Sequence, residues 1–133
     1  MQEHRATTTQ QDTITPGWTL FEAIPDCVKL LGMDGTVLAI NRNGLRAMEI
    51  DDIGTMRGKA WTAYWPQPAR PAVQAALDAA RAGGTGRFNA ACPTVRGTPR
   101  WWDVVVTRTE ASDGQAPHLL AVLRDIRDRK SVV

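Results

Sequence analysis

Histidine is scarce in this chain, and its scarcity excludes most kinds of reaction centre. The two histidines are His4 near the N-terminus and His118 in a late apolar stretch. Neither has reactive or ligand-like neighbours at a useful spacing, as a catalytic triad or a histidine-bound metal site would require. We therefore expect no catalytic residue, no metal site and no enzymatic activity in this chain.

Long apolar runs, blocks of charge and multiple cysteines are also missing. No stretch approaches the roughly 18 apolar residues that span a bilayer, and the polar N-terminus lacks a signal peptide's apolar run. The net charge is only +2 and the basic residues are scattered, which argues against nucleic acid as a partner. We expect a cytoplasmic protein without a membrane span. Cys27 and Cys92 are either a disulfide or two buried reduced thiols, and the thiols are favoured.

What is present fits one ordinary globular domain. The chain has 133 residues, of which 43% are apolar and 23% are charged, so one core suffices and disorder is not indicated for the body. Residues 1–17 hold almost no apolar side chains and are predicted to form a flexible leader. We assign the domain to residues 18–130, and residues 131–133 to a tail or the start of a linker.

The first half of the domain predicts a hairpin and a helix. Short apolar runs at residues 28–31 and 36–40 flank Gly32-Met33-Asp34-Gly35, a sequence typical of a hairpin turn. Asn41 follows directly and is a good N-cap for a helix from Arg42 to about Glu49. A ligand contact is the alternative role for Asn41, and capping is favoured. Residues 50–66 have poor periodicity and predict short turns and loops.

The second half predicts a helix and three strands. The helix begins near Pro68 and Pro71, carries apolar residues at helical spacing, and stops at Gly83-Gly84. Its apolar residues are Val73, Ala76, Leu77 and Ala80. The strands are predicted at residues 88–92, 100–107 and 118–125. Trp101 and Trp102 fall on opposite faces of the middle strand, so the face away from the core needs cover from the leader helix, from a partner or from its own neighbours.

The ordered set of these elements resembles a PAS domain. The exit Asp125-Ile126-Arg127-Asp128-Arg129-Lys130 is similar to the family's D-I-T-E-R-K, and Gly58-Lys59-Ala60-Trp61 and Tyr64-Trp65-Pro66 fall in the expected order. The resemblance covers about residues 24–130. Two positions depart from the pattern: Gly32 replaces the first Asp of the usual D-x-D-G turn, and Arg127 replaces the exit Thr.

The resemblance implies a fold and a role. The expected fold is α+β: a five-stranded antiparallel sheet of strand order 2-1-5-4-3, with helices on one face and an N-terminal flanking helix. In relatives that helix packs outside the sheet or against a second copy, which makes Trp18 and Phe21 candidates for a dimer face. The implied role is the sensory input module of a bacterial sensor histidine kinase or related regulator, with a homodimer and a downstream output domain as partners.

The same resemblance suggests a ligand pocket and a signal relay. Aromatic side chains could line a pocket for a small molecule, or they could simply fill the core, which is favoured. Haem and flavin are not expected, because the relatives' axial histidine and photoadduct cysteine have no counterpart here. The pocket candidates are Asn41, Met56, Trp61, Trp65, Phe88, Trp102 and Val104.

Asp125, beside Arg124 and Arg127, is expected either to relay change to the linker or to form an exposed ion pair of little consequence. Two alternatives to a ligand-binding sensor remain. One is a dimerisation module without a ligand. The other is a small enzyme in an α+β cone, for which Asp103 would be the only acid at a strand centre, with no evident partner.

Overall fold

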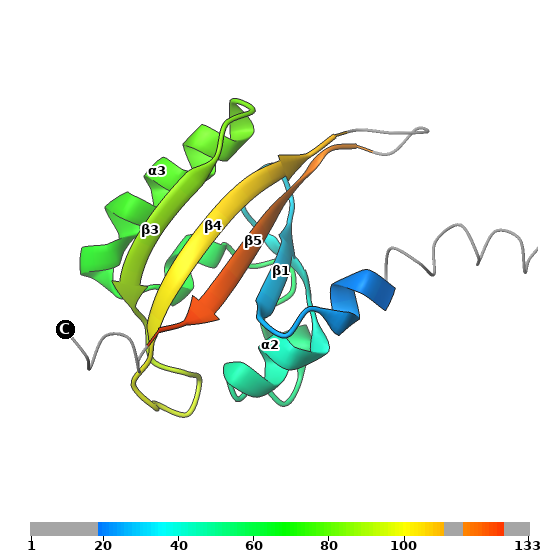
Figure 1. The fold of residues 1–133 in the computed structure, drawn as a ribbon. Helices are drawn as coiled ribbons and strands as arrows, with labels where there is room; N and C mark the ends of the chain where they lie inside the picture. The colour runs from blue at the N-terminus through cyan, green and yellow to red at the C-terminus, as the bar shows by residue number, and fades with distance from the viewer. Residues whose placement is uncertain (1–18, 111–115, 127–133) are drawn as a thin grey trace, which may run out of the picture.

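A five-stranded antiparallel sheet is the framework of the molecule (Figure 1). The computed structural model describes residues 19–110 and 116–126. The strands are β1 (Cys27–Leu31), β2 (Val37–Ile40), β3 (Gly86–Ala91), β4 (Trp101–Thr109) and β5 (His118–Asp125). They lie in the order β2-β1-β5-β4-β3, so the predicted topology is confirmed.

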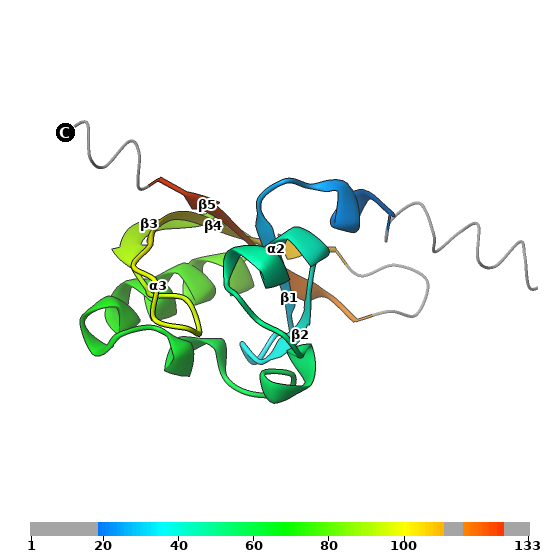
Figure 2. The same ribbon diagram turned by 90° about the horizontal axis from the view of Figure 1, so that it is seen from below.

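Helices cover one face of the sheet, as Figure 2 shows for α2 (Arg42–Ala47) and α3 (Arg70–Arg81). Between these helices the chain forms three short 3₁₀ helices, at Ile53–Thr55, Trp61–Tyr64 and Gln67–Ala69. This agrees with the poor periodicity of residues 50–66. Residues 19–23 form a helical turn on the side of the sheet away from α3 (Figure 2).

Asp34, the second Asp of the family's D-x-D-G pattern, stabilises the turn of the hairpin between β1 and β2. Asp34 Oδ1 accepts from the Thr36 amide at 3.0 Å and from the Thr36 hydroxyl at 2.8 Å. A Cβ at Gly32 would lie 2.8 Å from Asp34 Oδ1. The glycine that departs from the family pattern therefore gives the Asp34 carboxylate the room that its hydrogen bonds require.

Helix α2 is shorter than predicted because the chain reverses directly after it. Glu49 has a φ of 58°, and the Ile50 amide donates back to the Leu45 carbonyl at 2.8 Å. A residue in the left-handed region ends a helix in this way. The helix therefore ends at Ala47 instead of Glu49.

Helix α3 follows the sequence pattern closely and packs on β3. Its buried residues are the predicted Val73, Ala76, Leu77 and Ala80. At the end of the helix, the Gly83 and Gly84 amides donate to the Ala80 and Ala79 carbonyls, both at 2.9 Å. This is a Schellman motif, and the φ of +94° at Gly83 makes glycine the suitable residue there.

The long strands β4 and β5 pair along their whole length and alternate between two faces. Trp102, Val104 and Val106 of β4 are buried on the inner face. Leu119, Ala121 and Leu123 of β5 are buried beside them. The residues between them face outward and are partly exposed. β4 starts one residue later and ends two residues later than predicted.

Strand β3 starts two residues earlier than predicted, because the register pairs Gly86 with Val106. Cys92 lies just beyond its end. The leader, Trp18, residues 111–115 and the exit from Arg127 onward lie outside the described residues.

Candidate functional site

A small cavity lies between the inner face of the sheet and the segment that joins α2 to α3. Its free volume is about 20 Å³, which is room for about one water molecule. Its walls are mostly apolar and come from four strand or near-strand positions, the end of α2 and the 3₁₀ segment. The lining residues are Lys29, Met48, Met56, Trp61, Tyr64, Trp65, Cys92, Trp102 and Leu123.

Four of the seven predicted pocket residues line this cavity, namely Met56, Trp61, Trp65 and Trp102. Phe88 and Val104 do not line it. Phe88 packs behind the wall, with its ring centroid 5.2 Å from that of Trp65 and 6.4 Å from that of Trp61.

The wall tryptophans are held firmly in place. Trp61 and Trp65 meet edge to face with centroids 5.7 Å apart, an arrangement that adds to the stabilisation from their burial. Trp102 is 1% exposed, and its Nε1 donates to the Cys92 carbonyl at 3.0 Å. These rings give the cavity a rigid aromatic side. Met48 and Met56, which are unbranched and flexible, form its adaptable side.

Asn41 is used by the fold and lies away from the cavity wall. It is fully buried and is the N-cap of α2, where its Oδ1 accepts from the Gly44 amide and from the Val28 amide, both at 2.9 Å. Its Nδ2 donates to three carbonyls of the segment before β1, at Phe21, Ile24 and Asp26. The capping role is therefore the one found, and no capacity is left for a ligand.

Lys29 is the one charged side chain in the wall, and the sequence analysis missed it. It lies in the middle of β1, is 2% exposed, and pairs in register with Ala121 of the inner face. Its Nζ lies 3.3 Å from Cys27 Sγ. Among the ion pairs of the described residues, none includes Lys29. The sequence does contain a feature that indicates this position. Lys29 is two residues from both Cys27 and Leu31, and side chains at that spacing share one face of a strand.

Both cysteines are free and buried, so the favoured thiol interpretation is confirmed. Cys92 lies in the cavity wall. Its burial raises the pKa of the Cys92 thiol, and the positive charge of Lys29 opposes that effect. The lysine charge therefore acts across the cavity.

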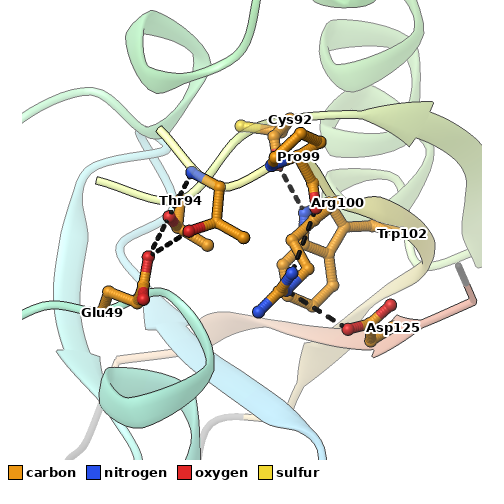
Figure 3. Close-up of polar contacts among 8 residues, drawn as sticks. Glu49, Cys92, Thr94, Pro99, Arg100, Trp102 and Asp125 are labelled. Atoms are coloured by element: carbon orange, nitrogen blue, oxygen red, sulfur yellow. Dashed lines mark hydrogen bonds and ion pairs between the residues drawn. The ribbon is translucent and has the colours of Figure 1, made fainter. Parts of the chain in front are cut away.

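A short hydrogen-bonded path leads from the cavity wall to the strand end that carries Asp125 (Figure 3). The Cys92 amide donates to the Arg100 carbonyl at 3.0 Å. The Arg100 guanidinium in turn lies 3.3 Å from Asp125 Oδ2, with both side chains partly buried. Arg100 is thus a partner that the sequence did not predict for Asp125. Arg124 is exposed, and Arg127 lies outside the described residues.

The loop between β3 and β4 is anchored to the end of α2 by Glu49. Its carboxylate accepts from the hydroxyls of Thr94 and Thr98, the latter at 2.7 Å. Figure 3 shows Glu49 beside Thr94. These two hydrogen bonds lower the pKa of Glu49 below its ordinary value. The Val95 amide also donates to the Met48 carbonyl at 3.0 Å, so this loop contacts the backbone of a residue in the cavity wall.

Of the two residues predicted for a dimer face, the structure describes only Phe21. Trp18 lies outside the described residues, and Phe21 is half-buried. Leu20, between them, is 67% exposed. It is therefore the apolar side chain of this turn that a partner could cover.

Neither a metal cluster nor a spanning helix is found in the described part of the chain. No group of three or more His, Cys, Asp or Glu side chains in residues 19–110 and 116–126 could hold a metal ion. Over the same residues, every helix is too short or too polar to cross a bilayer.

Comparisons with known proteins agree on one family. The family model described as "PAS fold" matches residues 21–131. The PAS domain of an HTR-like protein from Haloarcula marismortui is 21% identical, with a TM-score of 0.76, and the match covers 93% of this chain and 100% of that one. A PAS domain from Colwellia psychrerythraea is 13% identical, with a TM-score of 0.73 and coverages of 88% and 99%.

The LOV protein of Rhodobacter sphaeroides is 15% identical, with a TM-score of 0.65 and coverages of 81% and 64%. No curated protein sequence matches the chain. At these identities the solved structures establish the fold alone. The family model, which matches most of the sequence, establishes that this chain belongs to the PAS-fold family.

Proposed function

We propose that this PAS domain is a sensory input module that binds a small molecule in the cavity beneath its sheet. The observation that carries the proposal is the cavity itself: its wall is mostly apolar and carries a single charged group. Sites for small molecules have this make-up, with apolar walls and few polar groups that fix orientation. A cue shifts the domain between two states by binding them unequally.

The proposed signal leaves through Arg100 and Asp125. Trp102 and Cys92 both line the cavity. The Trp102 Nε1 donates a hydrogen bond to the Cys92 carbonyl, and the Cys92 amide donates one to the Arg100 carbonyl. A ligand that contacts Trp102 and Cys92 therefore acts on the segment whose guanidinium holds Asp125 at the strand end. Beyond that point the chain continues toward whatever output region the full protein contains.

We place this module in a bacterial sensor histidine kinase or a related multidomain regulator in the cytoplasm. Two buried free thiols suit a reducing compartment. In this proposal catalysis belongs to a downstream region, and this chain supplies regulation.

We further propose that the ligand is neither haem nor a photoadduct-forming flavin. His118 lies at the start of β5 with its side chain on the outer face, away from the cavity wall. Lys59, Ala60 and Trp61 occupy the segment where flavin-photoadduct relatives carry their reactive cysteine.

Native mass spectrometry of the purified chain tests the binding function, because it reports bound small molecules and subunit number together. In the full-length protein, Asp125→Ala is expected to reduce the signal-dependent change in output while the fold is retained. Asp51→Ala is the matched control, since Asp51 forms an exposed pair with Arg96. An Asp125→Ala protein with unchanged signal-dependent output would contradict the relay.

A homodimer is the second proposal, and the outer face of the sheet favours it. Leu30 and Leu120 are paired neighbours there, as are Val105 and Val122, and all four are only half-buried. These four side chains form an apolar surface that a second copy would cover, and Leu20 of the N-terminal helical turn is a further exposed apolar side chain.

Sedimentation at several concentrations tests this dimer. Val105→Glu is expected to yield monomers, whereas Asn89→Glu, on the exposed edge strand, is expected to leave the mass unchanged. A concentration-dependent mass, with no bound molecule and no response to any ligand, would favour a dimerisation module without a ligand. A mass that stays monomeric at all concentrations would contradict the dimer.

A further inference from the structure

Lys29 presents a buried positive charge to an apolar cavity, and nothing in the described chain neutralises it. The side chain is 2% exposed. Its one polar contact is Cys27 Sγ at 3.3 Å, and a thiol sulfur is only a weak acceptor. A buried ammonium without an anionic partner is costly, so buried charges in proteins are paired as a rule.

We propose that the cavity binds a small monocarboxylate with a short apolar body, and that Lys29 is the counter-charge for its carboxylate. This inference rests on the proposed ligand-binding function and names the chemical class of the ligand. The carboxylate replaces the missing acceptor at Nζ. The apolar body meets the aromatic side of the cavity formed by Trp61, Trp65 and Trp102.

The composition of the wall selects a carboxylate over a phosphate or sulfate. A phosphate group carries up to two charges and three strong acceptor oxygens, which need several donors. The wall offers one ammonium, while the Trp102 N–H is already bound to the Cys92 carbonyl. The other polar groups of the lining residues, which are the Tyr64 hydroxyl, the Cys92 thiol and the indole N–H groups of Trp61 and Trp65, carry no charge. The single ammonium of the wall therefore matches the single charge of a carboxylate.

The size of the cavity limits the ligand and identifies the part of the wall that must move. The free volume of about 20 Å³ holds one water molecule, so a ligand of several heavy atoms enters only if side chains yield. Met48 and Met56 can yield because their unbranched thioethers change rotamer readily. Met56 also belongs to the segment of short 3₁₀ helices, which has less regular hydrogen bonding than the sheet. The ligand is therefore compact, and its entry displaces the methionine side of the wall.

Pairs of compounds that match in shape and differ in charge test the inference on the whole chain. Acetate, butyrate and benzoate are compared with acetamide, butyramide and benzamide at equal concentration, with sodium chloride added to equalise ionic strength. Melting temperature and tryptophan emission are measured, since three tryptophans line the cavity. At least one carboxylate is expected to raise the melting temperature and alter the emission, while its amide does neither.

Two variants assign the effect to Lys29. Lys29→Met and Lys29→Gln are expected to weaken binding of the responding carboxylate by about 30-fold or more, the usual consequence of removing one member of a buried charge pair. Lys59→Met is the matched control, because Lys59 is exposed and does not line the cavity. It is expected to bind as the wild type does.

The possible results separate the inference from the function on which it rests. Equal binding of carboxylates and amides, or unchanged carboxylate binding by both Lys29 variants, overturns the anion assignment and leaves a ligand-binding domain. A protein that responds to no compound of either kind, and carries no bound molecule in native mass spectrometry, overturns both.

Discussion

Replacing Asn41, the N-cap of α2, with alanine should destabilise the domain more than alanine at any polar position within α2. The Asn41 side chain accepts from two amides, those of Val28 and Gly44, and donates to three carbonyls. Alanine would leave two buried amides without acceptors, at a cost of about 1–3 kcal/mol each. The three carbonyls lie in a part-buried region and regain some hydration. We therefore expect the free energy of unfolding to fall by about 3–5 kcal/mol.

Urea unfolding followed by tryptophan fluorescence measures this loss. The midpoint should fall while the dependence of the unfolding free energy on urea concentration stays unchanged. Asn43→Ala, at the second residue of α2, is the matched control, because the Asn43 side chain donates a single hydrogen bond, to the Ile24 carbonyl at 2.8 Å. It should cost only about 0.5–1.5 kcal/mol.

A third variant separates the two halves of the Asn41 contribution. Asn41→Asp keeps the acceptor for Val28 and Gly44 but replaces the donor with an oxygen that faces three carbonyls, so it should still be strongly destabilised. If Asn41→Ala cost no more than Asn43→Ala, the assignment of Asn41 as the connection between the N-terminal segment, β1 and α2 would be wrong.

Other predictions concern packing, acid stability and thiol reactivity. Gly86→Ala should lower the free energy of unfolding by about 1–3 kcal/mol, because its methyl group would collide with the Ala76 backbone; Gly84→Ala, which meets only one carbonyl at 3.3 Å, should cost less, and equal costs would contradict this close packing. Glu49 has a folded-state pKa below its ordinary 4.5, so its stabilisation is present above about pH 5 and is lost as pH falls through the lowered value. The melting temperatures of wild type and Glu49→Gln should therefore converge on acidification, and a constant difference would refute the assignment. Cys92, whose burial raises its pKa, should react slowly with iodoacetamide at neutral pH in the native protein and rapidly in urea; equal rates would show that the thiol is accessible.

The fold was predictable because its local signals agree with one another. The Asp34-Gly35 turn, the Asn41 cap and the Gly83-Gly84 stop each mark an element boundary, and the structure places all three boundaries there. The end of α2 was not predictable in this way. Glu49 adopts a positive φ because tertiary hydrogen bonds to Thr94 and Thr98 hold it, and those partners are more than forty residues away.

The candidate site was only partly predictable, because its geometry depends on strand register and depth. Phe88 and Val104 point inward as alternation requires, yet packing places them behind the cavity wall. The Arg100–Asp125 pair joins residues 25 positions apart in sequence. It forms because the register sets Trp102 opposite Asp125, and no local pattern in the sequence specifies that register.

Burying the Lys29 ammonium without an anionic partner costs folding free energy, and a costly buried charge is informative about function. A methionine at this position would have a similar length and would fill the same inner-face space without a charge. Replacing buried charged groups with apolar ones of similar volume is often neutral or stabilising by about 1–4 kcal/mol. We therefore expect Lys29→Met to melt at the same or a higher temperature than wild type in the absence of any carboxylate, with Lys59→Met unchanged. If Lys29→Met were instead strongly destabilised, the ammonium would be contributing to the fold itself. The charge would then need no ligand to account for it. If Lys29→Met melts as expected, the fold does not need this lysine, and an anion bound in the cavity that Lys29 lines is the best explanation for its charge.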